Sequence, residues 1–146
     1  MPDDQRFLEI ALREAEASLA EGGIPIGACL VRAGEVIGAG HNQRVQAGDP
    51  TAHGEISAMR AAGRQRTYRD TVMYSTLMPC HMCAGTIVQF GIPRVVAGES
   101  KTYPGAEAFL REHRVAVEVM DDSRCIALME RFIEQYPEIW AEDIGE

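Results

Sequence analysis

The chain has 146 residues, of which 46% are hydrophobic and 25% are charged, ordinary proportions for one globular domain. Acidic residues outnumber basic ones by 22 to 14, which gives a formal net charge of −8. Nucleic-acid binding needs clustered Lys and Arg, so this balance favours a small neutral substrate over a polynucleotide. No apolar run approaches the roughly 20 residues that span a bilayer, and the start of the chain is acidic, unlike a secretory signal. We therefore expect a single cytoplasmic domain over residues 1–146, with neither a membrane nor a nucleic acid as partner.

The predicted elements alternate between helices and strands. Residues 6–20 repeat apolar side chains at a period near 3.6, which predicts an amphipathic helix ended by the glycines at 22–23. Strands at 26–31 and 36–37 form a hairpin, and the Gly-, Asn-, Asp- and Pro-rich residues 38–51 indicate a loop. Further on, the patterns predict strands at 71–76, 94–97 and 115–119, and helices at 52–63, 81–90, 106–113, 121–136 and from Pro137 to the end.

Alternating strands and helices after an opening hairpin predict the fold class. Short connections let the helices return to both faces of one sheet. We expect a three-layer α/β/α domain with a mixed central sheet of about five strands.

The four cysteines divide into two kinds. Cys29 lies in an apolar strand and Cys125 in a helix, which is typical of plain core thiols. Cys80 and Cys83 form a C-x-x-C pair, and in a reducing compartment such a pair favours metal or redox chemistry over a disulfide.

Two short segments carry the candidate chemistry, His53-Gly54-Glu55 and the Pro79–Cys83 run, each where a loop enters a predicted helix. His53, Cys80 and Cys83 supply three ligands that suit one Zn²⁺ and leave a fourth position open, as catalytic zinc sites do. Partial positive charge at a helix N-terminus also helps thiolates to form. Glu55 follows the His by two residues and is not expected to bind the ion, so we interpret it as the general acid–base.

Two other interpretations of the C-x-x-C pair stay open. A thioredoxin-like redox pair would leave His53 and Glu55 without a role. A structural zinc site would need a fourth ligand from His81 or His41, and His81 lies inside the C-x-x-C itself. The H-x-E and P-C-x-x-C combination matches the motif of zinc nucleobase deaminases.

With these residues in place, the sequence resembles the fungal-type cytosine deaminases of the cytidine deaminase-like superfamily. The likeness runs nearly end to end, and the Asp-Ile-Gly-Glu ending is more specific than the zinc motif. The matching segments are Gly22–Gly27, Gly40–Asn42, His53–Ser57, Pro79-Cys80, Met82-Cys83, Gly91–Arg94 and Trp140–Glu146.

The resemblance implies a role for each matching position. His53, Cys80 and Cys83 correspond to the ligands of one zinc ion per chain, and Glu55 to the proton shuttle. Asn42 corresponds to the amide that binds the carbonyl edge of the pyrimidine, and Asp143 to the acceptor for its amino group. The remaining substrate-site positions are Trp140, Tyr103 (commonly Phe in the family), Ile26, Leu77, Met78 and Gly54. Members form homodimers and bury a free base beneath the C-terminal segment.

The expected reaction is cytosine plus water giving uracil plus ammonia, in pyrimidine salvage. Met78 replaces a common Ser, and His81 replaces an acidic residue between the cysteines, so the ring that is accepted stays open. Related substrates are a modified cytosine, a triazine or a guanine-like purine. A tRNA adenosine deaminase and a non-catalytic zinc-binding module are the other hypotheses.

Overall fold

The protein is described by a computed structural model over residues 2–146, with side chains from residue 3 onwards. None of the helices in this range is long and apolar enough to cross a membrane. The elements are α1 (Pro2–Ala20), β1 (Gly27–Arg32), β2 (Glu35–His41), α2 (Arg44–Ala47), α3 (Gly54–Ala62), β3 (Thr71–Ser75), α4 (His81–Phe90), β4 (Arg94–Ala97), α5 (Glu107–Glu112), β5 (Ala116–Val119), α6 (Ser123–Gln135) and α7 (Pro137–Asp143).

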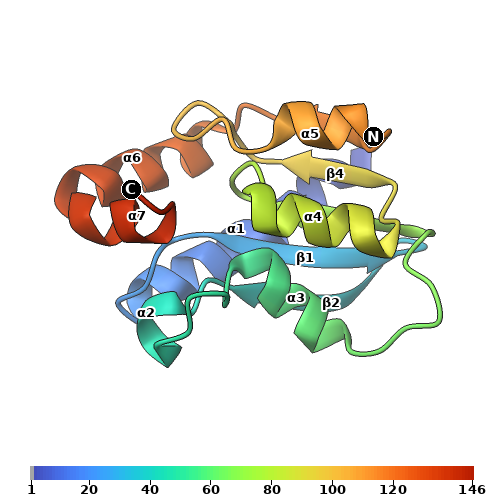
Figure 1. Cartoon of the computed structure of the whole chain (residues 1–146), viewed down its shortest axis with the longest axis horizontal. Coiled ribbons are helices and arrows are strands. Elements are labelled where there is room, and N and C mark those ends of the chain that lie inside the picture. The colour runs from blue at the N-terminus through green and yellow to red at the C-terminus, as the bar shows by residue number, and fades with distance from the viewer. Residues whose placement is uncertain (1) are drawn as a thin grey trace.

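The five strands form one mixed sheet in the order β2-β1-β3-β4-β5. The strand β1 is antiparallel to both β2 and β3, whereas β3, β4 and β5 run parallel. Figure 1 shows α3 and α4 in front of the sheet and α1 behind it. The predicted three-layer α/β/α fold with a mixed sheet of five strands is confirmed.

The second strand is longer than the sequence indicated. We expected a loop from residue 38, but β2 continues to His41, and Arg44–Ala47 form the short helix α2. Gly38 and Gly40 are strand residues on which α3 packs directly. A Cβ at Gly38 would overlap the Ala58 carbonyl oxygen, and one at Gly40 would lie 2.9 Å from the Ala58 nitrogen. These glycines therefore mark a close approach of helix to sheet, not a turn.

Most other boundaries agree with the prediction to within two residues. The start of α6 has a clear physical reason. We expected this helix from residue 121, but Asp122 is its N-cap, and its carboxylate accepts hydrogen bonds from the backbone nitrogens of Arg124 and Cys125 at 2.8 and 3.3 Å. Such a cap fixes the first helical residue at the next position, Ser123.

An apolar layer lies on each face of the sheet. One layer joins the sheet to α3, α4 and α5 and includes Leu30, Met73, Ile87 and Leu110, all fully buried. The other joins it to α1 and includes Phe7, Ala11, Cys29, Tyr74 and Val96.

A third apolar cluster closes one end of the sheet. It gathers side chains from the segment before β1, the segment after β3, and the two C-terminal helices α6 and α7. Figure 1 shows these two helices together at the left. Its buried members are Ile24, Ile26, Leu77, Met129, Phe132 and Trp140. The candidate site lies against this cluster.

Candidate active site

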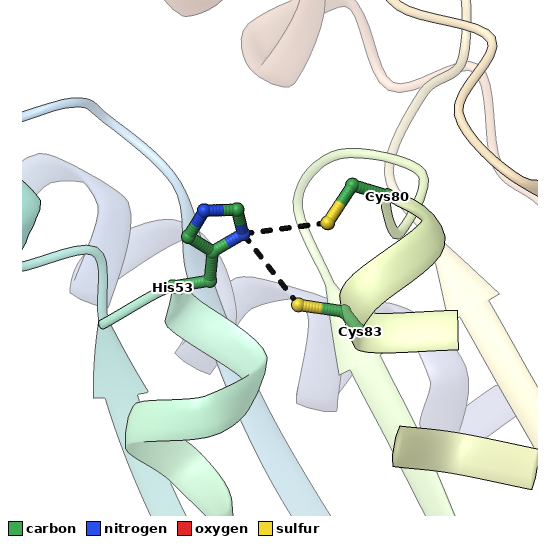
Figure 2. A group of neighbouring side chains, drawn as sticks. All are labelled: His53, Cys80 and Cys83. Carbon is green, nitrogen blue, oxygen red and sulfur yellow. Dashed lines mark hydrogen bonds between the residues drawn. The ribbon is translucent and has the colours of Figure 1, made fainter. Parts of the chain in front are cut away.

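The structure brings His53, Cys80 and Cys83 together from two helix N-termini. His53 is the N-cap of α3 and Cys80 is the N-cap of α4, with Cys83 in the first turn of α4. Figure 2 shows the imidazole of His53 pointing across to both thiols. Its Nδ1 lies 3.4 Å from the Cys80 Sγ and 3.6 Å from the Cys83 Sγ.

These three side chains fit a zinc ion. Nitrogen at about 2.0 Å and sulfur at about 2.3 Å from a tetrahedral zinc lie about 3.5 Å apart, which matches both observed distances. The three ligand atoms all lie within 4.8 Å of one another, and over residues 3–146 no fourth His, Cys, Asp or Glu joins the group. The site therefore has the three-ligand composition of catalytic zinc, not the four of structural zinc.

The ionisation of the group favours metal binding. A hydrogen bond with Cys83 lowers the pKa of Cys80 to about 4. Burial acts to raise this pKa, and the contact with His53 acts to lower it. Burial acts to lower the pKa of His53, but its hydrogen bonds with Asp143 and Cys80 outweigh this and raise the pKa to about 10. A thiolate is thus already available as a ligand, and metal binding displaces the imidazole proton.

Glu55 lies beside the three ligands in the first turn of α3 and is 5% exposed. Burial and the neighbouring Cys80 thiolate raise the pKa of Glu55 to about 7. A carboxyl group with a pKa near neutrality can both take up and release a proton, which suits a general acid–base.

A small cavity opens onto this cluster. Apolar walls and a few polar groups converge on it, a composition typical of small-molecule sites. The lining residues are Ile26, Asn42, His53, Glu55, Leu77, Met78, Cys80, Tyr103, Trp140, Asp143 and Ile144.

Asp143, at the end of α7, connects the polar wall of the cavity to the ligand cluster. Its Oδ1 lies 3.4 Å from the Nδ2 of Asn42 and 3.4 Å from the Nε2 of His53. The carboxylate, whose side chain is only 3% exposed, therefore contacts the nitrogen of His53 that faces away from the thiols. A carboxylate in this position fixes the orientation of a metal-binding imidazole.

Two aromatic rings close the cavity. Trp140 from α7 and Tyr103 from the segment after β4 meet edge to face, with centroids 5.6 Å apart and an interplanar angle of 89°. Met78 is 1% exposed and lines the cavity with an apolar side chain. The side chain of a Ser at this position would be smaller and polar. These residues come from distant parts of the chain, so the cavity exists only in the folded protein.

Residues 1–99 match the family described as the cytidine and deoxycytidylate deaminase zinc-binding region. The chain belongs to this family. It is 46% identical to the cytosine deaminase of Candida albicans over 147 residues, which cover 99% of this chain and 98% of that protein.

Other members of the deaminase family are similar at lower identity. A tRNA-specific adenosine deaminase of Streptococcus pyogenes is 36% identical over 141 residues, covering 88% of this chain and 89% of that protein. A solved chain from work on A-to-I editing by tRNA:A34 deaminases has a TM-score of 0.74 at 30% identity and covers 85% of this chain and 99% of that one. The fold and the zinc-binding region are thus those of the deaminase family.

The two histidines considered as a fourth ligand lie outside the cluster. His81 is exposed, with its ring 6.5 Å from the ring of Phe109. The ring of His41 lies within hydrogen-bond distance of Glu14 on α1 and of Glu21 just beyond the end of α1. Neither histidine joins the three ligands.

The cavity lining differs from the predicted set of site residues at three positions. Gly54 and the predicted ligand Cys83 are both buried, and neither is among the lining residues. Ile144 lines the cavity and was not among the predicted site residues. Its place directly after Asp143 in the C-terminal segment is the signal that could have identified it.

Proposed function

We propose that the protein is a zinc-dependent hydrolase that converts free cytosine and water to uracil and ammonia. The observation that carries the proposal is the convergence of an imidazole, two thiols and an unliganded buried carboxylate at the base of a cavity closed by aromatic side chains. The near full-length similarity to the Candida albicans cytosine deaminase supports cytosine as the substrate.

His53, Cys80 and Cys83 would hold the metal. When bound, zinc supplies Lewis-acid activation of water. Glu55 takes the proton from the attacking water and delivers it to the ring nitrogen beside C4. The oxygen of the water bonds to C4 in this first step. Glu55 then takes the second proton from the new C4 hydroxyl and delivers it to the exocyclic amine, so that the bond from C4 to the amine breaks, the C4 carbonyl forms and ammonia leaves.

The polar groups of the cavity complement the edge of a cytosine. The Oδ1 of Asn42 accepts a hydrogen bond from the backbone nitrogen of Arg44 at 2.9 Å. This bond leaves the Nδ2 amide as the donor, which suits the ring carbonyl. Asp143 is an acceptor and suits the exocyclic amine, which donates. Ile26, Leu77 and the two aromatic rings enclose the faces of the base.

The position of the C-terminal helix favours a free base over a nucleotide within a polymer, because Trp140 and Asp143 of α7 line the cavity. Similarity to tRNA-specific adenosine deaminases makes an adenosine in tRNA the second candidate substrate. The net charge of −8 opposes this candidate, because a polyanion would be repelled.

An ammonia-release assay with zinc-loaded protein tests the proposal. The substrates are cytosine, 5-methylcytosine, cytidine, an aminotriazine, guanine and an anticodon stem-loop containing adenosine. We expect ammonia from cytosine, and its loss when a chelator removes zinc. Release from guanine or the stem-loop with cytosine inert would overturn the substrate, and bound zinc without release from any compound would make the protein a binding module.

We also propose that the enzyme acts in cytoplasmic pyrimidine salvage as a homodimer. The outer face of α4 supports an interface, since Met82 and Phe90 are 37% and 47% exposed and Gly85 between them faces open space. The mass of the zinc-loaded protein in solution tests the dimer.

A further inference from the structure

A second polar cluster lies beside the cavity, outside the groups used for chemistry. It is centred on His41, the last residue of β2, whose side chain is 12% exposed. The ring Nδ1 lies 2.7 Å from a carboxylate oxygen of Glu14, and the ring Nε2 lies 2.9 Å from a carboxylate oxygen of Glu21. His41 therefore bridges two acidic side chains that are seven residues apart on α1 and just beyond its end.

This geometry favours the protonated form of His41. A neutral imidazole has one N–H and one lone pair, so it can donate to only one carboxylate and would place its lone pair against the other. The imidazolium form donates from both nitrogens. Since Glu14 and Glu21 both lie at hydrogen-bond distance from the ring, the geometry favours the imidazolium form of His41.

The same cluster holds the backbone of Asn42, the residue after His41. The Asn42 carbonyl oxygen accepts hydrogen bonds from the Ser18 Oγ at 2.7 Å and from the Gln46 Nε2 at 3.1 Å. That Nε2 also contacts Glu21 at 3.2 Å. The Gln46 Oε1 is buried without a hydrogen-bond partner. Gln46 therefore supports the Asn42 carbonyl through its Nε2 alone.

The sheet explains why the ring of His41 reaches α1. His41 pairs with Gly27 across the antiparallel strands, and paired residues present their side chains on the same face. A Cβ at Gly27 would overlap the backbone of α1 at Ala11 and Ala15. The helix α1 therefore passes directly over Gly27. His41 lies beside Gly27 on the neighbouring strand, so its side chain contacts the same helix.

We propose that His41, as an imidazolium bridging Glu14 and Glu21, is a positioning residue that fixes Asn42 in the substrate cavity. The bridge ties the end of β2 to the last turns of α1, and Ser18 and Gln46 complete the support of the Asn42 backbone. This inference rests on the proposed function, in which the Asn42 amide donates to the substrate carbonyl. The Asn42 side chain can keep its contact with Asp143 only while its backbone is held.

The surroundings determine how the bridge responds to pH. Burial acts to lower the pKa of His41, but Glu14 and Glu21 outweigh it, and the pKa is raised above its ordinary value. Of the other packed elements, α2 presents the neutral Gln46 and β1 presents Gly27. The helix α3 packs on the opposite face of β2, and its Arg60 is paired with Asp49 at 3.6 Å. The bridge therefore persists to a higher pH than an ordinary histidine would allow, and it is lost as the pH rises through the raised pKa.

The first test needs no substrate. The ¹⁵N resonances of the histidine rings and of the Asn42 side-chain amide are recorded in zinc-loaded protein across the pH range. We expect His41 to carry protons on both nitrogens at pH 7, and the Asn42 amide resonance to shift when the ring is deprotonated. A neutral His41 at pH 7, or an Asn42 resonance that does not follow its titration, would overturn the proposal.

The second test separates binding from turnover. Changing His41 to Gln should raise KM for cytosine about tenfold with kcat nearly unchanged, because the Asn42 contact acts on substrate and transition state alike. The matched control is His113→Gln, at the exposed C-cap of α5, where the ring Nδ1 lies 2.9 Å from the Phe109 carbonyl oxygen. This variant should change neither constant.

A double variant guards against a merely structural effect. In His41→Gln with Glu21→Gln, the new amide oxygen at position 41 faces an amide donor instead of a carboxylate, so a neutral bridge can form and KM should fall back toward the wild-type value. Equal losses in single and double variants would contradict the proposal. If wild-type protein releases no ammonia from cytosine, the proposed substrate fails, while the resonance test still decides the protonation of His41.

Discussion

Two buried aspartates show how the protein distinguishes a supporting cluster from a reactive one. Asp4, 1% exposed, accepts hydrogen bonds from the Tyr74 hydroxyl at 2.7 Å and from two nitrogens of Arg94 at 2.9 and 2.6 Å. Asp143 is also buried, but its two contacts, to Asn42 and His53, are both 3.4 Å long.

The two carboxylates differ in whether they can still accept a further hydrogen bond. Around Asp4, short charge-assisted hydrogen bonds saturate the carboxylate, and Glu118 also neutralises Arg94 at 2.6 Å. Around Asp143 the contacts are long and the carboxylate faces the cavity, so it keeps capacity for a donor from outside. A saturated cluster stabilises the fold, whereas an unsaturated one is available for a substrate.

The largest expected effect comes from changing Glu55 to Gln at the reactive cluster. The amide keeps the size of the side chain but cannot carry protons, so kcat should fall about 10²–10⁴-fold. Zinc content and thermal stability should stay near wild type, because Glu55 is not one of the three ligands. Ammonia release and metal analysis on the same preparation check this, and a variant with half the wild-type kcat would exclude Glu55 as the proton shuttle.

Changing Asp4 to Asn tests the supporting cluster. The variant leaves Arg94 without its main partner, so the free energy of unfolding should fall by about 2–3 kcal/mol, measured by denaturant titration. The activity per folded molecule should not change. The control is Asp3→Asn, at an exposed neighbour, which should lower the free energy of unfolding by less than about 0.5 kcal/mol. Equal losses in both variants would show that the buried hydrogen bonds of Asp4 do not stabilise the fold.

The pH dependence of this difference has a definite sign. The hydrogen bonds from Arg94 hold the pKa of Asp4 well below its ordinary value. A depressed pKa contributes stability above the unfolded value of about 3.9 and loses it as the pH falls toward the folded value. The gap between wild type and Asp4→Asn should therefore be constant from about pH 5 to 8 and should shrink below about pH 4.

The sequence predicts the reactive cluster better than the supporting one. Two short motifs, at the starts of α3 and α4, contain His53 and Glu55 in one and Cys80 and Cys83 in the other, so local spacing already places each pair at a helix start. The Asp4–Arg94 pair joins residues 90 positions apart, and nothing local to either residue signals it. Only the packing of α1 on the assembled sheet brings them together.

The same limit explains the errors near β2. Composition alone marks Gly38 and Gly40 as loop residues, because a glycine that admits a neighbouring helix looks the same in sequence as one that turns the chain. The bridge of His41 to α1 depends on that strand reaching residue 41. A pattern of side chains cannot reveal such a contact until the packing of helix on sheet is known.

Changing Asp143 to Asn should have the smallest effect of these variants, and the affinity for zinc is the quantity that it should change. In Asp143→Asn an amide oxygen can still accept from the His53 Nε2, so the imidazole keeps its orientation and loses only the charge that strengthens it as a ligand. Zinc affinity should fall about tenfold, measured by competition with a chromogenic chelator in the absence of substrate. The control is Glu142→Gln, an exposed neighbour that pairs with Arg44 at 3.3 Å and should leave zinc affinity unchanged. If both variants bind zinc as wild type does, the 3.4 Å contact is not orienting the ligand, and Asp143 serves the substrate alone.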